Sequence, residues 1–323
     1  MKVVCLRRVA ALLFLSVVVV SLSARSVRAD RYGFWTMDEA SGNITDLIGG
    51  HPQGVATGAP SYGQPGVPNG TYGAITVSNA HGTSIGFGPS NVDEFFTLGT
   101  DNNNAALSID SAGSLTVMGW VNPSAPTITS TYRFFSTGSA GGADRGWGIG
   151  LRFNDTTGNN NRIRFTTYGI ADNDSSPIPV TFGQWMHIAA TYNNGAINYY
   201  LNGNHVGNSN SVFGNESAAG RLVIGGRLGG NDVDQMNGLI DGVQIYNHVL
   251  SIDEIRIAAA ESVPEPSTIA LTAIGLGRPA VTIMECCCFS WVICSRILQR
   301  LTASKGSLEE MSALSSHVIR ILS

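Results

Sequence analysis

The chain has 323 residues, a formal net charge of −4 and 13% charged residues, where an average soluble domain has about 25%. Its 39 glycines are typical of a turn-rich β protein, and its few Lys and Arg residues form no basic stripe along the sequence. Nucleic-acid binding is therefore excluded, because the chain lacks the electrostatic footprint that such binding requires.

The N-terminal segment has the three parts of a secretory signal peptide. Basic residues, the last of them Arg8, precede an apolar run from Val9 to Val20, and Val27-Arg28-Ala29 is a small-x-small cleavage site. The run of about 12 apolar residues is shorter than the ~20 that span a bilayer as a helix. We predict a signal peptide over residues 1–29, cleavage after Ala29, and a protein that is secreted or held in the cell envelope.

The sequence pattern in the middle of the chain predicts many short strands. Between Arg31 and Ile257, alternating segments are separated by clusters of Gly, Asn, Pro and Ser, which is the pattern of an all-β sandwich. Several segments carry aliphatic residues on one parity and Asn or Thr on the other, as strands with one wet face do. The clearest predicted strands are Ser114–Val121, Trp147–Phe153, Arg162–Tyr168, Trp185–Tyr192, Ala196–Leu201, Arg221–Gly225 and Leu239–Tyr246.

An Asn-Gly pair predicts one tight hairpin. Asn202 and Gly203 stand between two alternating runs, and both residue types accept the positive φ that a two-residue hairpin turn needs. We therefore predict a hairpin over Ile197–Val206.

A capping box predicts a short helix near the end of the middle region. The Ser251 side chain can accept from the Glu254 amide while the Glu254 carboxylate reaches back to the serine amide. Leu250 and Ile255 flank this motif as a hydrophobic staple. The predicted helix covers Ser251–Ala260 and closes the domain.

Taken in order, these motifs resemble the landmarks of a laminin-G-like domain of the concanavalin A-like lectin/glucanase type. The resemblance begins at Tyr32–Gly42 and covers about Arg31 to Ala260. Its later landmarks are Leu115–Val121, Gln184–Tyr192, Tyr199–Gly203, Ile224–Gly226 and Gly238–Tyr246. It implies an antiparallel two-sheet jelly-roll sandwich over residues 30–260, with a short C-terminal helix. Members of this family mostly bind carbohydrate or protein, and many hold calcium.

Asp241 and Asp46 are the candidate calcium ligands. Asp241 shares strand parity with Val243 and Ile245, so its carboxylate should point to the apolar side, where it needs a partner. One interpretation is a Ca²⁺ site completed by Asp46 and by backbone carbonyls of the following loop, an all-oxygen shell that suits a hard cation. The other is a carboxylate that accepts backbone N–H bonds from the opening loop.

Trp120 and Trp185 are the candidate ligand-binding residues. Trp120 lies on the opposite parity from Val117 and Val121, and Trp185 shares parity with His187. An aromatic ring on a wet sheet face can stack on a sugar, whereas the same ring under a covering element belongs to a core. Both interpretations stay open for each tryptophan.

The sequence offers no catalytic constellation. A jelly-roll glycosidase needs two carboxylates across the scissile bond, but the adjacent pairs Asp38-Glu39, Asp93-Glu94 and Asp253-Glu254 point to opposite faces if extended. The histidines are scattered without ligand spacing. We therefore expect a protein that is not an enzyme.

The C-terminal segment resembles a degenerate PEP-CTERM sorting signal. Pro264, Glu265 and Pro266 precede an apolar stretch that ends at Gly277. The resemblance implies processing of residues 261–277 by exosortase-type sorting machinery. Arg278-Pro279 interrupts the apolar stretch and no basic cluster closes it, so residues 278–323 are an atypical tail, as a frameshift would give.

These expectations combine into one functional hypothesis. It is an exported, non-catalytic binding module that recognises polysaccharide or a surface protein and contacts the membrane only through its processed ends. The alternative is a structural surface or exopolysaccharide-associated protein without a specific small ligand. A glycoside hydrolase would need a carboxylate pair that the sequence does not present.

Overall fold

The computed structural model describes residues 31–89, 93–98, 113–126, 130–137, 146–154, 160–211, 222–227 and 234–261. The chain divides into two units, Met1–Val263 and Pro264–Ser323, and the described residues all lie in the first. The predicted signal peptide with Ala29, the sorting motif at Pro264, Glu265 and Pro266, and the tail lie outside the described residues. Within the described ranges, no helix is long and apolar enough to cross a bilayer.

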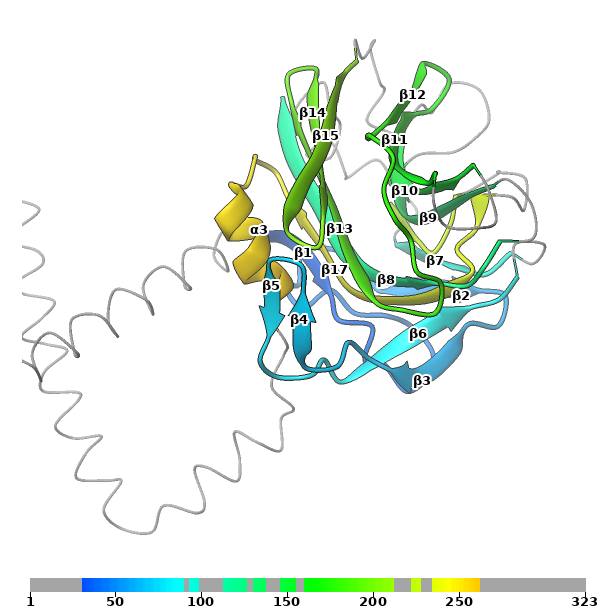
Figure 1. The fold of residues 1–323 in the computed structure, drawn as a ribbon. Helices are drawn as coiled ribbons and strands as arrows, with labels where there is room; N and C mark the ends of the chain where they lie inside the picture. Colours follow the sequence, from blue (N-terminus) through cyan, green and yellow to red (C-terminus); the bar gives the residue numbers. More distant parts are fainter. Residues whose placement is uncertain are drawn as a thin grey trace, which may run out of the picture. The chain divides into compact units, whose positions relative to one another are not determined.

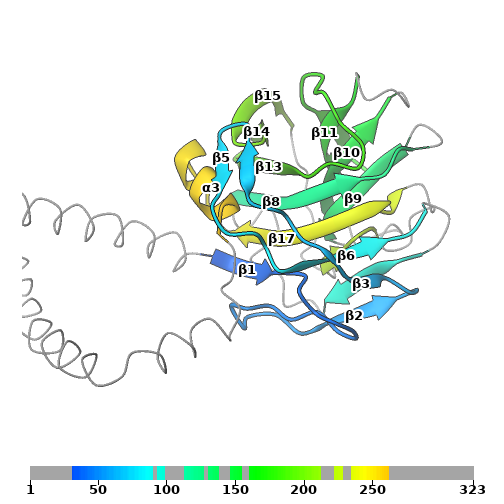
Figure 2. The same ribbon diagram turned by 60° about the horizontal axis from the view of Figure 1, so that its bottom comes forward.

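One layer of the domain is an antiparallel sheet, here called sheet A. Its strands are β1 (Arg31–Trp35), β3 (Ser61–Pro65), β6 (Thr83–Phe87), β8 (Ser114–Pro123), β13 (Met186–Asn193), β14 (Ala196–Leu201), β15 (Asn204–Asn210) and β17 (Gly238–Tyr246). They run in the order β15-β14-β13-β8-β17-β6-β3, with β1 also paired to β17 (Figure 1). In the turned view, β8 and β17 cross the middle of the domain side by side (Figure 2).

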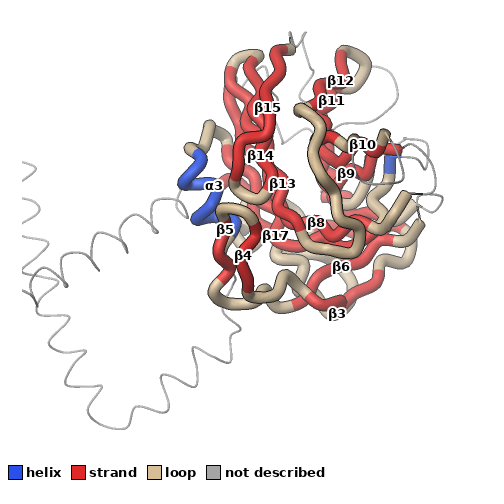
Figure 3. Tube along the Cα trace, viewed as in Figure 1, coloured by secondary structure: helices blue, strands red, loops and turns tan. Residues whose placement is uncertain are grey.

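The facing layer is a second antiparallel sheet, sheet B. Its strands are β2 (Gly54–Thr57), β7 (Phe95–Leu98), β9 (Ser130–Thr137), β10 (Trp147–Phe153), β11 (Arg162–Thr167), β12 (Ala171–Asp174) and β16 (Leu222–Ile224). They run in the order β12-β11-β10-β9-β16-β7-β2. Strands dominate the described part of the chain (Figure 3), and the predicted two-sheet antiparallel sandwich is confirmed.

The main core fills the space between the two sheets. Val117 and Ile188 reach it from sheet A, and Phe135 and Ile149 reach it from sheet B, all fully buried. Trp147 stacks on Phe165 with ring centroids 5.3 Å apart. Burial of such side chains stabilises the fold by roughly 1.5–3 kcal/mol each, and it fixes which parity of every strand points inward.

A smaller layer covers part of the outer face of sheet A. It consists of the hairpin β4 (Gly70–Tyr72) and β5 (Ile75–Val77) and the helix α3 (Ile252–Ala259); α3 and β5 lie beside each other on the side of β8 and β17 (Figure 1). Leu250 and Ile255 pack on Met118 and Tyr246. This outer face is therefore apolar and closed where α3 lies.

Both local turn and cap predictions are confirmed. Asn202 and Gly203 have φ of 49° and 71°, which closes the β14–β15 hairpin as the Asn-Gly pair predicted. Ser251 is the N-cap of α3: the Glu254 amide donates to Ser251 Oγ at 3.3 Å, and the Ser251 amide donates to Glu254 Oε2 at 2.8 Å. Every strand predicted above is also present.

The predicted direction of Asp241 is wrong, because β17 contains a bulge. From Asp241 to Gln244 β17 advances three residues, while its partner β8 advances two, from Trp120 to Met118. Gly242, inside this irregularity, has φ of +54°, a conformation that glycine adopts readily. Val243 and Asp241 therefore face opposite sides of sheet A, and Asp241 lies on the outer side with Trp120.

Candidate functional site

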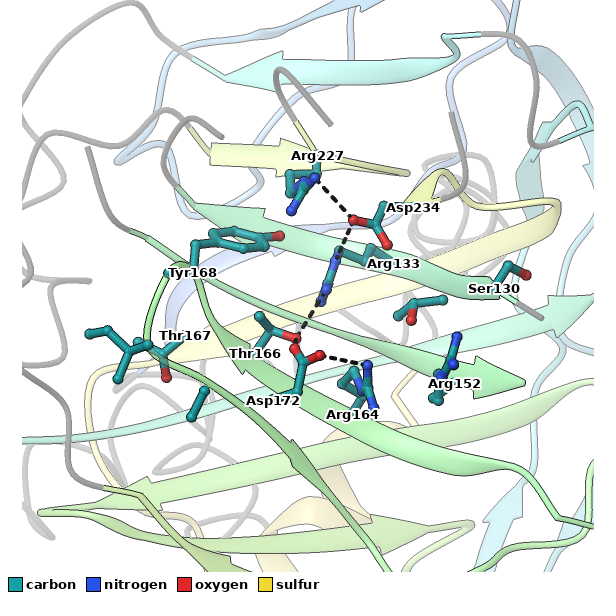
Figure 4. Close-up of a pocket in the computed structure, with 14 residues that line it drawn as sticks. Ser130, Arg133, Arg152, Arg164, Thr166, Thr167, Tyr168, Asp172, Arg227 and Asp234 are labelled. Atoms are coloured by element: carbon teal, nitrogen blue, oxygen red, sulfur yellow. Dashed lines mark hydrogen bonds and ion pairs between the residues drawn. The ribbon is translucent and has the colours of Figure 1, made fainter. Parts of the chain in front are cut away.

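A pocket of about 490 Å³ opens on the outer face of sheet B (Figure 4). It is lined by side chains of β9, β10, β11 and β12 whose parity points away from the core, by the turn from Tyr168 to Ala171, and by residues that follow β16. Its arginines are Arg133, Arg152, Arg164 and Arg227. The pocket is thus a polar hollow on a sheet face, in contrast to the covered face of sheet A.

Two glycines on β10 let neighbouring groups, one side chain and one backbone segment, approach that strand closely. A Cβ at Gly148 would lie 2.5 Å from the hydroxyl oxygen of Tyr168, and a Cβ at Gly150 would lie 2.2 Å from the carbonyl oxygen of Tyr132. Both distances are far below a van der Waals contact. Glycine at these outward positions therefore allows the Tyr168 side chain to lie over Gly148 and the backbone of β9 to approach Gly150 closely.

A chain of alternating charges crosses the pocket. Asp234 Oδ2 lies 3.2 Å from Arg227 Nη2 and 3.9 Å from Arg133 Nε. Arg133 Nη2 donates to Thr166 Oγ1 at 3.0 Å, and Thr166 Oγ1 donates to Asp172 Oδ1 at 2.6 Å (Figure 4). These contacts fix the side chains in one arrangement, because each link restricts the next.

Arg164 is held by carboxylates on β12. Its Nε and Nη2 donate to the two oxygens of Asp174 at 2.7 and 2.8 Å, and its Nη1 donates to Asp172 Oδ2 at 2.7 Å. The hydrogen bond to Asp174 raises the pKa of the Arg164 guanidinium. Arg164 is therefore a permanently charged, positioned group, and the bidentate geometry belongs to the strong class of ion pairs.

Tyr168 lies between two arginines. The Cζ atoms of Arg133 and Arg227 lie 5.1 and 5.0 Å from the centre of its ring, within the range of cation–π attraction. Burial raises the pKa of the Tyr168 phenol. The ring is thus a neutral aromatic wall that holds both guanidinium groups at the pocket.

Several guanidinium N–H groups have no acceptor among the described residues. Arg133 is only 3% exposed, yet its Nη1 has no hydrogen-bond partner, and the same holds for Nε of Arg152 and Nε of Arg227. Buried N–H groups are almost always paired, so these covered donors on side chains that line the pocket still need an acceptor. A hydroxyl, carbonyl or oxyanion oxygen fits this requirement.

The two candidate calcium ligands have separate sets of partners. Asp46 lies in the loop after β1 and accepts from the backbone N–H groups of Phe34, Ile48, Gly50 and His51 at 2.9 to 3.2 Å. His51 Nδ1 lies 2.8 Å from Asp46 Oδ2. Burial alone would raise the pKa of Asp46, but the bonds from His51 and from backbone amides outweigh it and lower that pKa.

Asp241 lies under the covering layer of sheet A. Its Oδ2 accepts from the Val67 amide at 3.1 Å, and its Oδ1 lies 3.3 Å from His81 Nδ1. Burial raises the pKa of its carboxyl, against the lowering effect of His81 and Val67.

The opening-loop amides thus bind Asp46, whereas Asp241 accepts from the Val67 amide, outside the loop that the second interpretation named. No group of three His, Cys, Asp or Glu side chains that could hold a metal ion occurs in the described ranges. A cation at Asp46 would face the same N–H dipoles that now point at its oxygens, and this arrangement does not fit a hard cation. Calcium binding itself stays a prediction.

Neither candidate tryptophan lines the pocket. Trp120 is 0% exposed, and its Nε1 donates to the carbonyl oxygen of Ala259 at 2.9 Å, so α3 leaves no ring face for a sugar. Trp120 is a core residue, and its assignment as a ligand-binding residue is corrected. Trp185 packs partly buried against the same cluster, and a ligand-binding role for it stays a prediction.

Sequence reasoning missed the arginine pocket. Arg133 lies on β9, a strand not among those predicted, and the other arginines come from separate elements. One signal was present: Arg162, Arg164 and Thr166 alternate with Ile163 and Phe165, so a strand there must point its arginines away from the core.

Comparison with known proteins agrees with this architecture. Residues 97–256 match the sequence model of the concanavalin A-like lectin/glucanases superfamily, Laminin_G_3. A comparison with curated protein sequences found no match.

Several solved structures are similar. Domain 4 of AbnA, a GH43 extracellular arabinanase from Geobacillus stearothermophilus in complex with arabinotriose, is 18% identical over 71% of this chain and 98% of its own, with a TM-score of 0.46. A SAP-like pentraxin from Limulus polyphemus is 20% identical over 47% of this chain and 72% of its own, with a TM-score of 0.38. A Trypanosoma rangeli sialidase mutant displaying trans-sialidase activity is 13% identical over 72% of this chain and 34% of its own, with a TM-score of 0.48. The laminin-G-like resemblance is confirmed by the sequence match, and the chain carries a domain of the concanavalin A-like lectin/glucanases superfamily.

Proposed function

We propose that this protein is an exported, non-catalytic module that binds carbohydrate through the pocket on sheet B. The observation that carries the proposal is the open pocket of about 490 Å³ with guanidinium donors that lack acceptors among the described residues. Sugars present many hydroxyl oxygens, which are acceptors for such donors. Membership of a superfamily of lectins and glucanases supports the same class of ligand.

The absence of catalysis is part of the proposal. Glycoside hydrolysis needs one carboxylic acid that can donate a proton and a second carboxylate on the other side of the bond. The lining carboxylates in the described part of the chain are Asp172 and Asp234, and both are bound by arginines. Oxygen atoms already engaged by guanidinium groups favour a positioning role for these two residues.

Export is proposed from the sequence alone. The signal peptide over residues 1–29 and the motif Pro264-Glu265-Pro266 would place the domain outside the inner membrane, where polysaccharides and other surface proteins are its available partners. Exosortase-type machinery is the expected partner of the C-terminal segment.

The test is affinity electrophoresis of the purified full-length protein in gels that contain neutral or acidic polysaccharides. We expect retardation by at least one polysaccharide, and we expect the double variant Arg227→Ala/Asp234→Ala to lose it. Arg256→Ala is the matched control, since Arg256 lies on α3, away from sheet B, and pairs with Asp253.

Retardation that survives in the pocket variant would contradict the pocket as the site. A lack of retardation by every polysaccharide would contradict the binding function and would favour the structural alternative, a surface protein without a specific small ligand.

A further inference from the structure

The charges that line the pocket do not balance. Four arginines line it, against the two aspartates Asp172 and Asp234. Asp234 pairs with both Arg227 and Arg133, while Arg164 pairs with Asp172 and also with Asp174 of β12. Arg152 is the remaining arginine, and no described carboxylate pairs with it. Once Asp174 is counted, the four lining arginines face three carboxylates, and Arg152 is the arginine without a described counter-charge.

A second arginine lies directly opposite Arg152. In the register of β10 and β11, Arg152 faces Arg162, and both belong to the parity that points away from the core. Arg162 Nη1 donates to the carbonyl oxygen of Ser175 at 2.8 Å, so its partner there is a neutral group. Like charges directly opposite each other on neighbouring strands are destabilising, and an anion bound between them would remove that repulsion.

The Nε–H group of Arg152 favours the same conclusion. Its Nε is buried and has no acceptor among the described residues. Thr131 is its neighbour on the other side, in the register of β9 and β10, and it too lines the pocket. A planar guanidinium whose Nε–H lacks a described acceptor, a second guanidinium opposite and a hydroxyl beside it form a site for an oxyanion, because arginine binds such groups through two parallel N–H bonds.

We propose that the ligand is an acidic saccharide whose oxyanion, a carboxylate or a sulfate, binds at Arg152 and Arg162. This inference rests on the carbohydrate-binding function proposed above and names the chemical class of its ligand. The sugar ring would then lie in the pocket beside Tyr168 and Arg227, and the oxyanion would take the place that no described carboxylate fills. Binding should weaken with added salt, because the site is partly open to solvent and its charges are screened.

The experiment compares saccharides that differ in charge. Isothermal titration calorimetry with the purified full-length protein uses oligogalacturonate against its methyl ester, and carrageenan oligosaccharide against agarose oligosaccharide. We expect the charged member of at least one pair to bind tenfold or more tightly than its neutral partner. The first pair reports a carboxylate and the second a sulfate.

Two variants and a control locate the site. Arg152→Gln and Arg162→Gln should each reduce the preference for the charged member at least tenfold, whereas Arg256→Gln on the helix α3 should leave it unchanged. Melting temperatures within about 2 °C of the parent protein would show that the variants remain folded.

The outcomes separate this inference from the proposed function. Equal binding of charged and neutral members, lost in the Arg227→Ala/Asp234→Ala variant, would overturn the acidic ligand and leave carbohydrate binding in place. A charge preference that persists in both Arg152→Gln and Arg162→Gln would overturn the assigned site. If no saccharide of either pair binds, the acidic ligand is overturned, and if the wider polysaccharide panel is also negative, the binding function falls with it.

Discussion

The outer face of sheet A and the outer face of sheet B are built from the same kind of alternating strand, yet one is closed and the other is open. On sheet A, the outward residues Met118 and Trp120 lie fully buried beneath α3 and its neighbours. On sheet B, the outward residues Arg133 and Arg152 line a polar pocket. Alternation thus determines which side chains leave the core, but the covering layer determines whether they become a second core or a binding surface.

The largest difference between the two faces should appear when Trp120 is replaced. Trp120→Ala removes a fully buried ring and its hydrogen bond to Ala259, so we expect the free energy of unfolding to fall by about 3–5 kcal/mol. Urea unfolding followed by fluorescence measures this change. Trp185→Ala is the matched control, because Trp185 is only partly buried against the same cluster. An equal loss in the two variants would show that the covering layer adds little.

A second test contrasts the Asp46 carboxylate, whose oxygens accept several hydrogen bonds, with arginine N–H groups that lack acceptors in the described part of the chain. Asp46 binds several backbone N–H groups, including those of Phe34 and Ile48, whereas donors of Arg133 lack acceptors among the described residues. Asp46→Ala should lower the free energy of unfolding by about 2–4 kcal/mol, since buried N–H groups lose their partner. Thermal unfolding with calcium and with chelator is the companion measurement.

Because the oxygens of Asp46 already accept several N–H groups, we expect the same midpoint of thermal unfolding with calcium and with chelator. A midpoint that rises with calcium, and no longer rises in Asp241→Asn, would instead establish the calcium site that the family resemblance implied.

The covered face also predicts a pH dependence. His187 lies opposite Trp120 and is buried; burial and then the charge of His81 lower its pKa from 6.5 to about 3. Between these values the unfolded chain binds a proton that the folded protein does not, so stability rises with pH there and is lost as pH falls. The expected slope is about 1.4 kcal/mol per pH unit.

Chemical unfolding at a series of pH values between 6 and 4 measures this slope. His187→Leu should flatten the profile, whereas the exposed-face variant His205→Leu should not, since His205 lies on the edge strand β15 and is exposed. A parent profile without slope would contradict the buried neutral histidine.

On the open face, Gly148→Ala tests the packing beneath the pocket. The added Cβ would lie 2.5 Å from the Tyr168 hydroxyl oxygen, and moving that ring should lower the free energy of unfolding by about 1–3 kcal/mol. Because Tyr168 contacts both Arg133 and Arg227, saccharide binding should weaken as well. Gly70→Ala on β4 is a control for glycine replacement, because the heavy atoms nearest to its new Cβ lie 3.6 to 3.8 Å away, in ordinary van der Waals contact. Full binding by Gly148→Ala would separate Tyr168 from the site.

The same comparison explains what the sequence could predict. The Asn202-Gly203 turn and the Ser251 cap depend on residues within four positions of each other, and both were predicted from their chemistry alone. The cover over Trp120 comes from Ala259, far away in the sequence, and no local pattern encodes that contact. The bulge at Gly242 reversed the face of Asp241, because a period-2 argument fails when one strand carries an extra residue.

The pocket could not be predicted from the sequence for the same reason. Arg133, Arg152, Arg164 and Arg227 come from different elements and meet only through the pairing of β9 to β12 and the path after β16. Their outward parity could be predicted for β10 and β11, but their meeting at one hollow required the strand order, which depends on long-range contacts.

The smallest expected effect is also the most diagnostic of a binding face. Arg152 and Arg162 face each other across β10 and β11, and removing one of two opposed charges should raise the free energy of unfolding by about 0.2–0.5 kcal/mol. Arg152→Gln should therefore be slightly more stable than the parent protein at low salt, with the gain shrinking at high salt because screening already weakens the repulsion. Urea unfolding at 20 mM and 500 mM salt measures the gain in stability and its dependence on salt. Arg164→Gln is the control with the opposite expected sign, a loss of stability, since it breaks the pairs with Asp172 and Asp174. A loss of stability in Arg152→Gln at low salt would show that Arg152 supports the fold. A gain would show that Arg152 weakens the fold, and a residue that weakens the fold is explained by a function, such as binding the oxyanion proposed for this end of the pocket.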